Sequence, residues 1–436
     1  MTERLLQFIW QFGHFNFHEL RLETGETLQI LSPGEFNTYQ GPDFLWGSVR
    51  IDDTLWVGNI ELHLSASDWQ KHAHGSDKQY DNVILHVVWE NDLPQGQDHL
   101  PGERNIPLLV LQPRVPKLFL GKYEEWMTNR SFIPCERQVK EIGASLWQEW
   151  KQDLLKIRLQ RKTRLIAEYL QQNNHDWEET AWWLLARNFG YKVNTGIFEA
   201  VARSLPLRLL SRHRDRPDQL EALLFGQAGL LKQHFKAAYP QALQKEFQFL
   251  RNKYGLRPVH EPVHFLRMRP SNFPTIRLSQ LAGVLQGAFP LMSRIREADS
   301  PAELEDLFSI AASEFWDRQY TLGESREQEG EGTLTQKKLG TDMKGSILIN
   351  TLAPLLFAYG SLHQEEHCRD KAVQWLQDAH TENNSIIAGW AGLGVTTDNA
   401  ADSQALLELK DRYCNVRKCL ECSIGKSLLG RTINSP

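Results

Sequence analysis

The hydrophobic pattern of this chain changes near residue 135, and that change limits the fold more than any other feature of the sequence. Before it, short apolar runs alternate with polar residues or are rich in β-branched residues, as is typical of β-strands. After it, apolar residues recur at helical spacing, as at Trp150, Leu154 and Ile157. The sequence therefore predicts an α+β protein, with a mixed β-rich α/β domain over residues 1–135 and a mainly helical region over residues 136–436.

The β-rich part contains five stretches that we expect to form strands, separated by turn-forming residues. The expected strands cover residues 28–31, 48–51, 55–64, 82–89 and 106–111. Asp52 and Asp53 lie between two of them, and this short polar pair predicts a tight hairpin. A stretch with apolar residues on one face, residues 2–15, predicts a helix before the first strand.

The charge of the chain is nearly balanced. Its 436 residues include 49 basic and 54 acidic side chains, which give a formal net charge of −5. Any nucleic-acid site therefore has to be a local basic patch. The N-terminus lacks the basic region of a signal peptide, and the sequence shows no transmembrane pattern. We expect a cytoplasmic protein without membrane contact, and the sequence leaves its oligomeric state open.

Two segments of the helical region differ from ordinary helices. Residues 324–340 are polar, rich in glycine and almost free of core-forming side chains, so we expect a mobile loop there. Arg267, Arg269 and Arg277 surround two prolines that would make a rigid turn. Arginines held in this way can form a fork that recognises phosphate or carboxylate, so these three residues are candidate substrate contacts.

The densest chemical pattern lies between residues 34 and 89. Asp43 stands at a turn that enters a strand, and Glu61 and His63 lie two residues apart in a later strand. Side chains alternate along a strand, so Glu61 and His63 share one face, where two polar groups need a partner or a function. Carboxylate oxygens are the ligands that Mg²⁺ and Mn²⁺ prefer, so Asp43 and Glu61 are the expected metal ligands.

Histidines surround this acidic pair. His72 and His74, together with His63 and His86, place four imidazoles within 24 residues. His74 is a candidate for activating a water molecule, and the group as a whole is an alternative site for Zn²⁺ or Mn²⁺. The residues expected to lie around the ligands or to touch substrate are Glu35, Asp68, His72 and His86.

Three of the five cysteines cluster near the C-terminus with the spacing C-x₄-C-x₂-C. They are Cys414, Cys419 and Cys422. Thiolates held by short loops suit Zn²⁺ or an iron–sulfur cluster. Cys135 is the preferred fourth ligand, because it would join the end of the β-rich part to the C-terminus, and Cys368 or His367 competes with it. Free thiols are a further alternative, whereas the odd number of cysteines and the missing secretion signal argue against disulfides.

The acidic pattern resembles the PD-(D/E)XK nuclease superfamily. Pro42-Asp43 matches the first part of its motif, and Glu61-Leu62-His63 matches the second. The resemblance implies a restriction-endonuclease-like fold for the N-terminal domain, with Asp43 and Glu61 as metal ligands. It puts His63 in the position usually held by lysine, and histidine differs from lysine in being neutral at pH 7 unless its pKa is shifted.

A second resemblance extends over nearly the whole chain. The residues that carry it are Gly41–Phe44, Trp56–His63, Ser67–Trp69, His72, His74, Tyr80, Asn82–Trp89, Pro134-Cys135, Arg269-Pro270, Asn272–Pro274, Tyr413-Cys414, Lys418–Leu420 and Cys422. Together they resemble the bacterial family called domain of unknown function 2851. This family label implies no activity, so the expected function depends on the chemistry of the residues.

The sequence thus leads to two functional hypotheses. The first is a nuclease or phosphodiesterase that uses Mg²⁺ or Mn²⁺ and acts on DNA or RNA, with Asp43 and Glu61 holding the ion and His63 and His74 assisting. The second is a non-catalytic binding or scaffold protein with a degenerate nuclease-like site and an anion-binding arginine loop. Bound metal and metal-dependent cleavage distinguish the two hypotheses.

Overall fold

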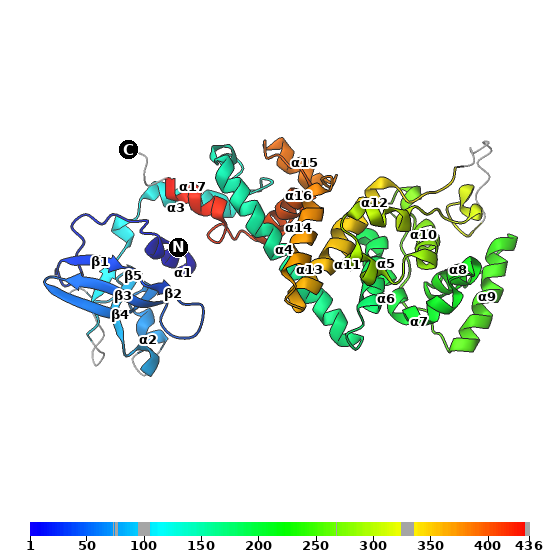
Figure 1. Ribbon diagram of the computed structural model, residues 1–436. Coiled ribbons are helices and arrows are strands. Elements are labelled where there is room, and N and C mark those ends of the chain that lie inside the picture. Colours follow the sequence, from blue (N-terminus) through cyan, green and yellow to red (C-terminus); the bar gives the residue numbers. More distant parts are fainter. Residues whose placement is uncertain (73, 75–76, 95–104, 267, 324–334, 432–436) are drawn as a thin grey trace. The chain divides into compact units, whose positions relative to one another are not determined.

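The structure is a computed structural model that describes residues 1–72, 74, 77–94, 105–266, 268–323 and 335–431 (Figure 1). The chain forms two compact units. The first comprises Met1–Trp150 together with Lys410–Pro436, and the second comprises Lys151–Leu409. The predicted α+β class is confirmed. The first unit extends beyond the expected boundary at residue 135 and also takes in the end of the chain.

The first unit is built on a six-stranded mixed sheet with the order β1-β3-β4-β5-β6, in which β2 pairs with β3. The strands are β1 (Leu28–Ser32), β2 (Glu35–Phe36), β3 (Phe44–Ile51), β4 (Thr54–Ser65), β5 (Val83–Glu90) and β6 (Leu108–Val110). The pairs β1–β3, β2–β3 and β3–β4 are antiparallel, whereas β4–β5 and β5–β6 are parallel. The segment between β4 and β5 therefore crosses over the sheet.

The predicted hairpin at Asp52 and Asp53 joins β3 to β4, with Ile51 paired to Thr54. Asp52 has a φ of 48°, in the left-handed region that aspartate tolerates better than most residues. Its carboxylate also accepts hydrogen bonds from the backbone N–H and the hydroxyl of Thr27, at 2.9 and 2.8 Å. This hairpin fixes the register of the two longest antiparallel strands.

Helix α1 (Glu3–Gln11) packs against β4 and presents Leu5, Leu6, Phe8, Ile9 and Trp10 to the core. Its first turn is capped by the hydroxyl of Thr2, which accepts a hydrogen bond from the backbone N–H of Leu5 at 3.3 Å. The apolar face of α1 explains why this helix covers the sheet. Its remaining face carries Glu3 and Gln7, one helical turn apart.

The rest of the first unit is helical. After β4 come α2 (Asp68–Lys71) and η2 (Lys78–Tyr80); after β6 come η3 (Gln112–Arg114), α3 (Lys117–Thr128), η4 (Val139–Glu141) and the start of α4 (Ala144–Gln172). The end of the chain adds η10 (Lys410–Cys414), a π-helical turn, and α17 (Ser423–Arg431). Lys122 of α3 donates a hydrogen bond to the carbonyl of Leu428 in α17 at 2.9 Å, which joins the two ends of this unit.

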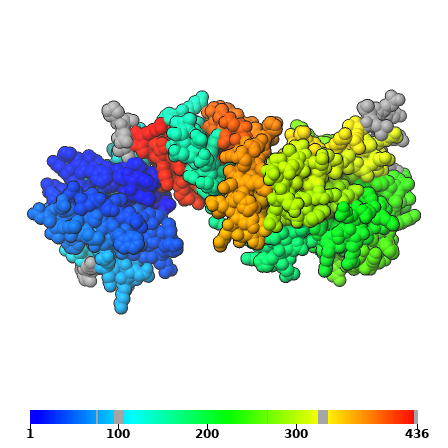
Figure 2. Space-filling view, in the orientation of Figure 1, coloured from blue at the N-terminus to red at the C-terminus, as the bar shows by residue number. Residues whose placement is uncertain are grey.

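The second unit is all helical within the residues that the structure describes. Its elements are the remainder of α4, α5 (Trp177–Phe189), α6 (Tyr191–Ser204), α7 (Leu207–Leu210), η5 (Ser211–His213), α8 (Pro217–Gln227), α9 (Ala238–Tyr254), η6 (Pro270–Asn272), α10 (Pro274–Gly287), α11 (Leu291–Glu297), η7 (Pro301–Phe308), η8 (Glu314–Asp317), α12 (Thr341–Ile347), η9 (Leu348–Leu352), α13 (Ala353–Leu362), α14 (Glu366–Asp378), α15 (Ser385–Gly392) and α16 (Ala400–Leu409). Buried tryptophans such as Trp182, Trp316 and Trp375 fill its core. Figure 2 shows side chains filling the space between these helices.

Two expectations for this region meet the structure only in part. Of the expected mobile loop 324–340, residues 324–334 lie outside the described residues. Lys338 forms an isolated antiparallel bridge with Ala311. Within the described residues, the continuous helical stretch Thr341–Leu362 is long and apolar enough to span a membrane, although most of it is buried inside the unit, as in the core helix of a soluble protein.

Candidate metal centre

Strands β4 and β5 bring the predicted polar residues together at the parallel step of the sheet. Glu61 and His63 occupy alternate positions of β4, and Glu61 pairs with His86 of β5. All three side chains are buried, with only 5%, 1% and 6% of their surface exposed, respectively. On a solvent-exposed strand face these side chains would be accessible to water. Here the predicted alternation puts them in a buried polar cluster instead.

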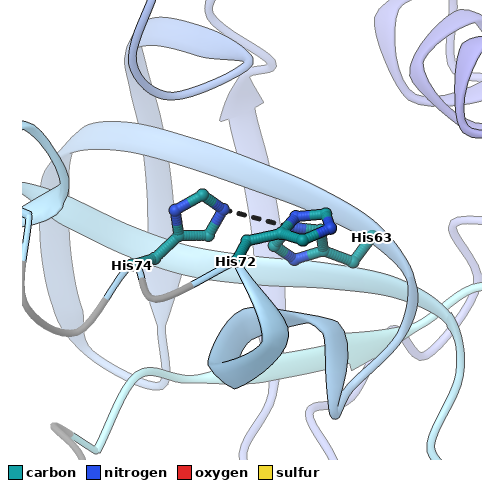
Figure 3. Close-up of side chains that lie close together, drawn as sticks. All are labelled: His63, His72 and His74. Carbon is teal, nitrogen blue, oxygen red and sulfur yellow. Dashed lines mark hydrogen bonds between the residues drawn. The ribbon is translucent and has the colours of Figure 1, made fainter.

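Three imidazoles form the centre of this cluster. Nε2 of His63 lies 3.1 Å from Nδ1 of His72 and 3.2 Å from Nε2 of His74. One ring nitrogen from each residue lies within 4.8 Å of the other two. Figure 3 shows the rings of His72 and His74, from the segment that follows α2, turned toward His63 on the strand. Three convergent imidazole nitrogens are a frequent ligand set for transition metals.

The carboxylate of Glu61 adds an oxygen donor to the three nitrogens. Its Oε1 lies 3.4 Å from Nε2 of His74 and 3.5 Å from Nε2 of His63. Neighbouring ligand atoms lie about 3.3 Å apart around an ion that binds four ligands tetrahedrally at about 2.0 Å. Glu61 and the imidazoles therefore have the spacing of atoms that share one ion. Three nitrogen donors favour Zn²⁺, Mn²⁺ or Fe²⁺ over the Mg²⁺ expected from the carboxylates alone.

Local packing holds the two loop histidines in place. His72 ends α2, whose Trp69 is buried beneath the site. The ring of Tyr80 stacks on His74 with 3.8 Å between centroids, and the ring of Trp69 meets His74 edge-on at 5.3 Å. His72 is exposed, so the site is reachable from solvent on that side.

The buried imidazoles are neutral. Burial, followed by the nearby charges of His86, His74 and His72, lowers the pKa of His63 to about 2. Burial also lowers the pKa of His86 to about 3. A neutral imidazole can bind a metal but cannot act as a cation, so His63 does not supply the positive charge that a lysine would supply.

Asp43 lies beside the cluster, at the entrance to β3, but both of its carboxylate oxygens already accept hydrogen bonds. Oδ1 accepts from the side chain of Gln7 at 2.8 Å, and Oδ2 accepts from the backbone N–H of Leu62 at 3.2 Å. The backbone N–H of Asp43 donates to Oε2 of Glu61 at 2.9 Å. Burial and the adjacent Glu61 raise the pKa of Asp43 to about 7. Asp43 thus holds Glu61 in position, whereas the imidazole nitrogens of His63 and His74 lie next to that carboxylate.

Helix α1 contributes two residues that we did not predict from the sequence. Gln7 contacts Asp43, and Glu3 interacts electrostatically with Glu61, His72 and His74. Burial, and then the charge of Glu61, raises the pKa of Glu3. The sequence feature that could have indicated these two residues is their spacing of four positions, which puts both on the polar face of an amphipathic helix. The sequence did not indicate that this face packs against the histidine cluster.

The other predicted residues of the first unit lie around the cluster or apart from it. Asp68 accepts hydrogen bonds from Lys71 at 2.7 Å and from the backbone N–H of Ser65 at 3.1 Å, so it stabilises the start of α2. Glu35 is exposed on β2. His86 lies next to His63, with His63 Nδ1 and His86 Nε2 separated by 2.9 Å.

The arginines of the predicted fork have different surroundings. Arg277 is only 5% exposed and donates hydrogen bonds to Asn272, Gln280 and the hydroxyl of Tyr191, at 2.6, 2.8 and 3.1 Å. Arg269 is exposed, and Arg267 lies outside the described residues. Arg277 therefore belongs to the core of the second unit, where its guanidinium donates hydrogen bonds to side chains of neighbouring elements.

The cysteines separate into two groups. Cys135, Cys414, Cys419 and Cys422 belong to the first unit, and Cys368 belongs to the second. Cys368 lies within ligand distance of Glu365 and His367, which form a second metal-capable group. No disulfide links any of the five cysteines, all of which lie in the described part of the chain.

Comparison with known proteins identifies a family. A family model described as "Protein of unknown function (DUF2851)" matches residues 3–385. The chain belongs to the DUF2851 family. No curated protein and no solved structure matches it. The DUF2851 match includes every residue of the histidine cluster as well as Cys135, and it ends before the three late cysteines.

Proposed function

We propose that this protein is a metal-dependent phosphodiester hydrolase that acts on nucleic acid. The observation that carries the proposal is the convergence of Glu61 Oε1, His63 Nε2 and His74 Nε2 with Nδ1 of His72, at separations of 3.1–3.5 Å along the measured contacts. A buried carboxylate beside the neutral, buried imidazole of His63, with two further imidazole nitrogens 3.1–3.2 Å from that ring, would be stabilised by a bound cation. Metal binding provides it.

Each residue has a distinct task in this proposal. Glu61, His63, His72 and His74 hold the ion, which when bound would acidify a water molecule and stabilise negative charge on a phosphate. Asp43 keeps Glu61 in place through its backbone N–H, and its buried carboxyl adds to the preference for a cation. His86 orients His63 through the opposite ring nitrogen. An ion that accepts five or six ligands, such as Mn²⁺, keeps positions for water and substrate.

The order of elements supports a nuclease. Helix α1 is followed by the antiparallel strands β1, β3 and β4, the crossover through α2 and the parallel strand β5, and we propose that this order corresponds to a PD-(D/E)XK core. Asp43 precedes the second of these three antiparallel strands, and Glu61 and His63 lie on the third. The choice of DNA or RNA as substrate depends on this resemblance. In this proposal His63 takes the position of the usual lysine and has two further histidines beside it. Three imidazole nitrogens would favour a transition metal over Mg²⁺.

The rival hypothesis, a non-catalytic binding protein, depended on an anion-binding arginine loop. Arg277 is buried and hydrogen-bonded within the second unit, so this arginine is not exposed for binding an anionic partner. The hydrolase is therefore the function that we put forward.

The test measures cleavage of single-stranded DNA, double-stranded DNA and RNA by the full-length chain, with Mn²⁺, Zn²⁺, Fe²⁺ or Mg²⁺ added after chelation. We expect cleavage with a transition metal, and loss of at least about 100-fold in rate for Glu61→Gln and His74→Ala. His18→Ala, which changes an exposed histidine of the same unit, is the matched control. If the protein binds metal but cleaves none of the three substrates, the proposed hydrolase activity is wrong.

A further inference from the structure

Four of the five cysteines gather in the first unit, apart from the histidine cluster. They are Cys135, Cys414, Cys419 and Cys422. Cys135, Cys419 and Cys422 are buried, and Cys414 is partly buried. They come from segments nearly 300 residues apart in sequence, so only tertiary structure can bring them together.

Backbone and side-chain contacts hold these two segments against each other. The guanidinium of Arg417, which lies between Cys414 and Cys419, donates to the carbonyls of Trp126 and Asn129. The side chain of Asn129 in turn donates to the carbonyl of Pro134 at 2.7 Å, directly before Cys135. The C-terminal segment is therefore fixed beside the loop that carries Cys135.

The late cysteines lie in a compact turn. The π-helical turn η10 ends at Cys414, whose carbonyl accepts from the backbone N–H of Arg417 at 3.2 Å. The backbone N–H of Cys422 donates to the carbonyl of Cys419 at 3.4 Å. A Cβ atom on Gly425 would stand 2.2 Å from that same carbonyl oxygen, so the start of α17 packs directly on the turn. This close approach allows only glycine.

The four thiols lie near enough to one another to interact. Each of the six pairs among them interacts electrostatically. Burial first, and then the neighbouring thiols, raise the pKa of Cys135 to about 12 and keep the pKa of Cys414 well above its usual range. Three buried thiols and one partly buried thiol, with no disulfide between them, thus gather in one region of the first unit.

Donors for a thiolate are already present at Cys422. The backbone N–H groups of Ile424 and Gly425, at the first turn of α17, stabilise its ionised form. The indole N–H of Trp150, which is buried without a hydrogen-bond partner, acts on the same sulfur. N–H groups directed at sulfur are a common surrounding of metal-bound thiolates. The basic side chains of Lys122, Arg417 and Lys426 add positive charge nearby.

We propose that Cys135, Cys414, Cys419 and Cys422 bind one metal centre through four thiolates, and that this centre joins the C-terminal segment to the loop after α3. Both Zn²⁺ and an iron–sulfur cluster take four thiolate ligands, so they share the chemistry that this site offers. Each thiol releases its proton to solvent as its sulfur binds the metal, and the metal replaces the positive charge of those protons. The centre is separate from the histidine cluster and has its own ligands.

The test is metal and sulfide analysis of the full-length chain purified without oxygen from cells supplied with iron and zinc. We expect about one zinc per chain in a colourless protein, or iron with acid-labile sulfide in a brown one. Cys135→Ser and Cys422→Ser should each lower that metal at least about tenfold. The matched control, Cys368→Ser, should keep it, and His74→Ala should keep it as well, which separates this centre from the histidine site.

A second measurement covers variants that fail to fold. In native wild-type protein, a thiol reagent should modify the four cysteines only as the metal is released, in a ratio of about four thiols per centre. The inference is overturned if the wild-type protein carries neither zinc nor iron in stoichiometric amounts. It is also overturned if the four thiols react while all bound metal stays in place.

Discussion

Nδ1 of His63 lies 2.9 Å from Nε2 of His86, in the interior of the sheet. Burial lowers the pKa of both rings, so both are neutral and one nitrogen of the pair has to donate while the other accepts. With Nδ1 of His63 as donor, its Nε2 is left with a free lone pair. That lone pair faces His72 and His74. In that arrangement the pair holds His63 in the tautomer that can bind a metal through Nε2.

Replacing His86 should weaken metal binding without removing a ligand. His86→Phe keeps the volume of the ring but leaves Nδ1–H of His63 without an acceptor, so we expect metal affinity to fall by about 10–100-fold. His86→Gln, whose carbonyl can accept that hydrogen bond, should recover part of the loss. Competition titration with a chromogenic chelator measures both. An unchanged affinity in His86→Phe would show that His63 needs no such partner.

Glu61 and Asp43 should respond differently to removal of their charge. Glu61→Gln replaces a carboxylate that lies 3.4–3.5 Å from two imidazoles, and we expect it to abolish tight metal binding. Asp43→Asn can keep both hydrogen bonds, because the amide of Gln7 can rotate to accept from it, so we expect affinity within about tenfold of wild type. Calorimetric titration compares the two. An equal loss in both variants would make Asp43 a ligand.

Lys162 should make the stability of the second unit depend on pH. Its ammonium group is buried and donates to Ile349, Asn350 and Gln404 at 3.0–3.2 Å. Burial, and then the charge of Arg158, lowers its pKa to about 7, against 10.5 for an ordinary lysine. Between these two pKa values the folded chain binds fewer protons at Lys162 than the unfolded chain does. The free energy of unfolding should therefore increase as the pH rises above about 7.

The measurement is urea unfolding of wild-type protein and Lys162→Met at several pH values between 7 and 9. The difference between the two curves isolates this lysine from other titrating groups. We expect the wild type to gain stability relative to the variant as the pH rises. A constant difference across the range would contradict a lowered pKa for Lys162.

Gly226 of α8 allows close contact with α9. A Cβ atom there would stand 2.1–2.4 Å from ring carbons of Phe247, so Gly226→Ala should cost about 1–3 kcal/mol of unfolding free energy. Gly196→Ala in α6, where no atom lies within 4 Å of the added methyl, is the matched control and should stabilise by about 0.5–1 kcal/mol. Thermal and urea unfolding measure both.

A double variant tests the cause. Phe247→Leu shortens the ring that the new methyl would meet, so Gly226→Ala should cost less in that background. Equal costs in the two backgrounds would show that the contact with Phe247 is not the reason.

Local patterns in the sequence predicted much of the first unit. The alternation of apolar and polar residues located the strands, and Asp52-Asp53 located the hairpin, because strand period and turn chemistry are properties of a few neighbouring residues. The same alternation put Glu61 and His63 on one face of β4. The sequence also indicated that four histidines would be near one another, since they fall within one strand–crossover–strand segment.

Only the tertiary structure decided which of these groups share one point in space. Parallel pairing of β4 with β5 put His86 behind His63, and the packing of α1 brought Gln7 and Glu3 to the cluster. These contacts join distant segments, so no local periodicity encodes them.

Burial was the other property that the sequence left open. From the sequence we expected Arg277 to be a substrate contact, whereas packing between helices buries it and pairs its guanidinium with Asn272 and Tyr191. Cys135 meets Cys422 because the end of the chain returns to the first unit. Side-chain type thus determined which chemistry is available, and long-range packing determined where it converges, because hydrophobic burial and not local preference brings distant segments together.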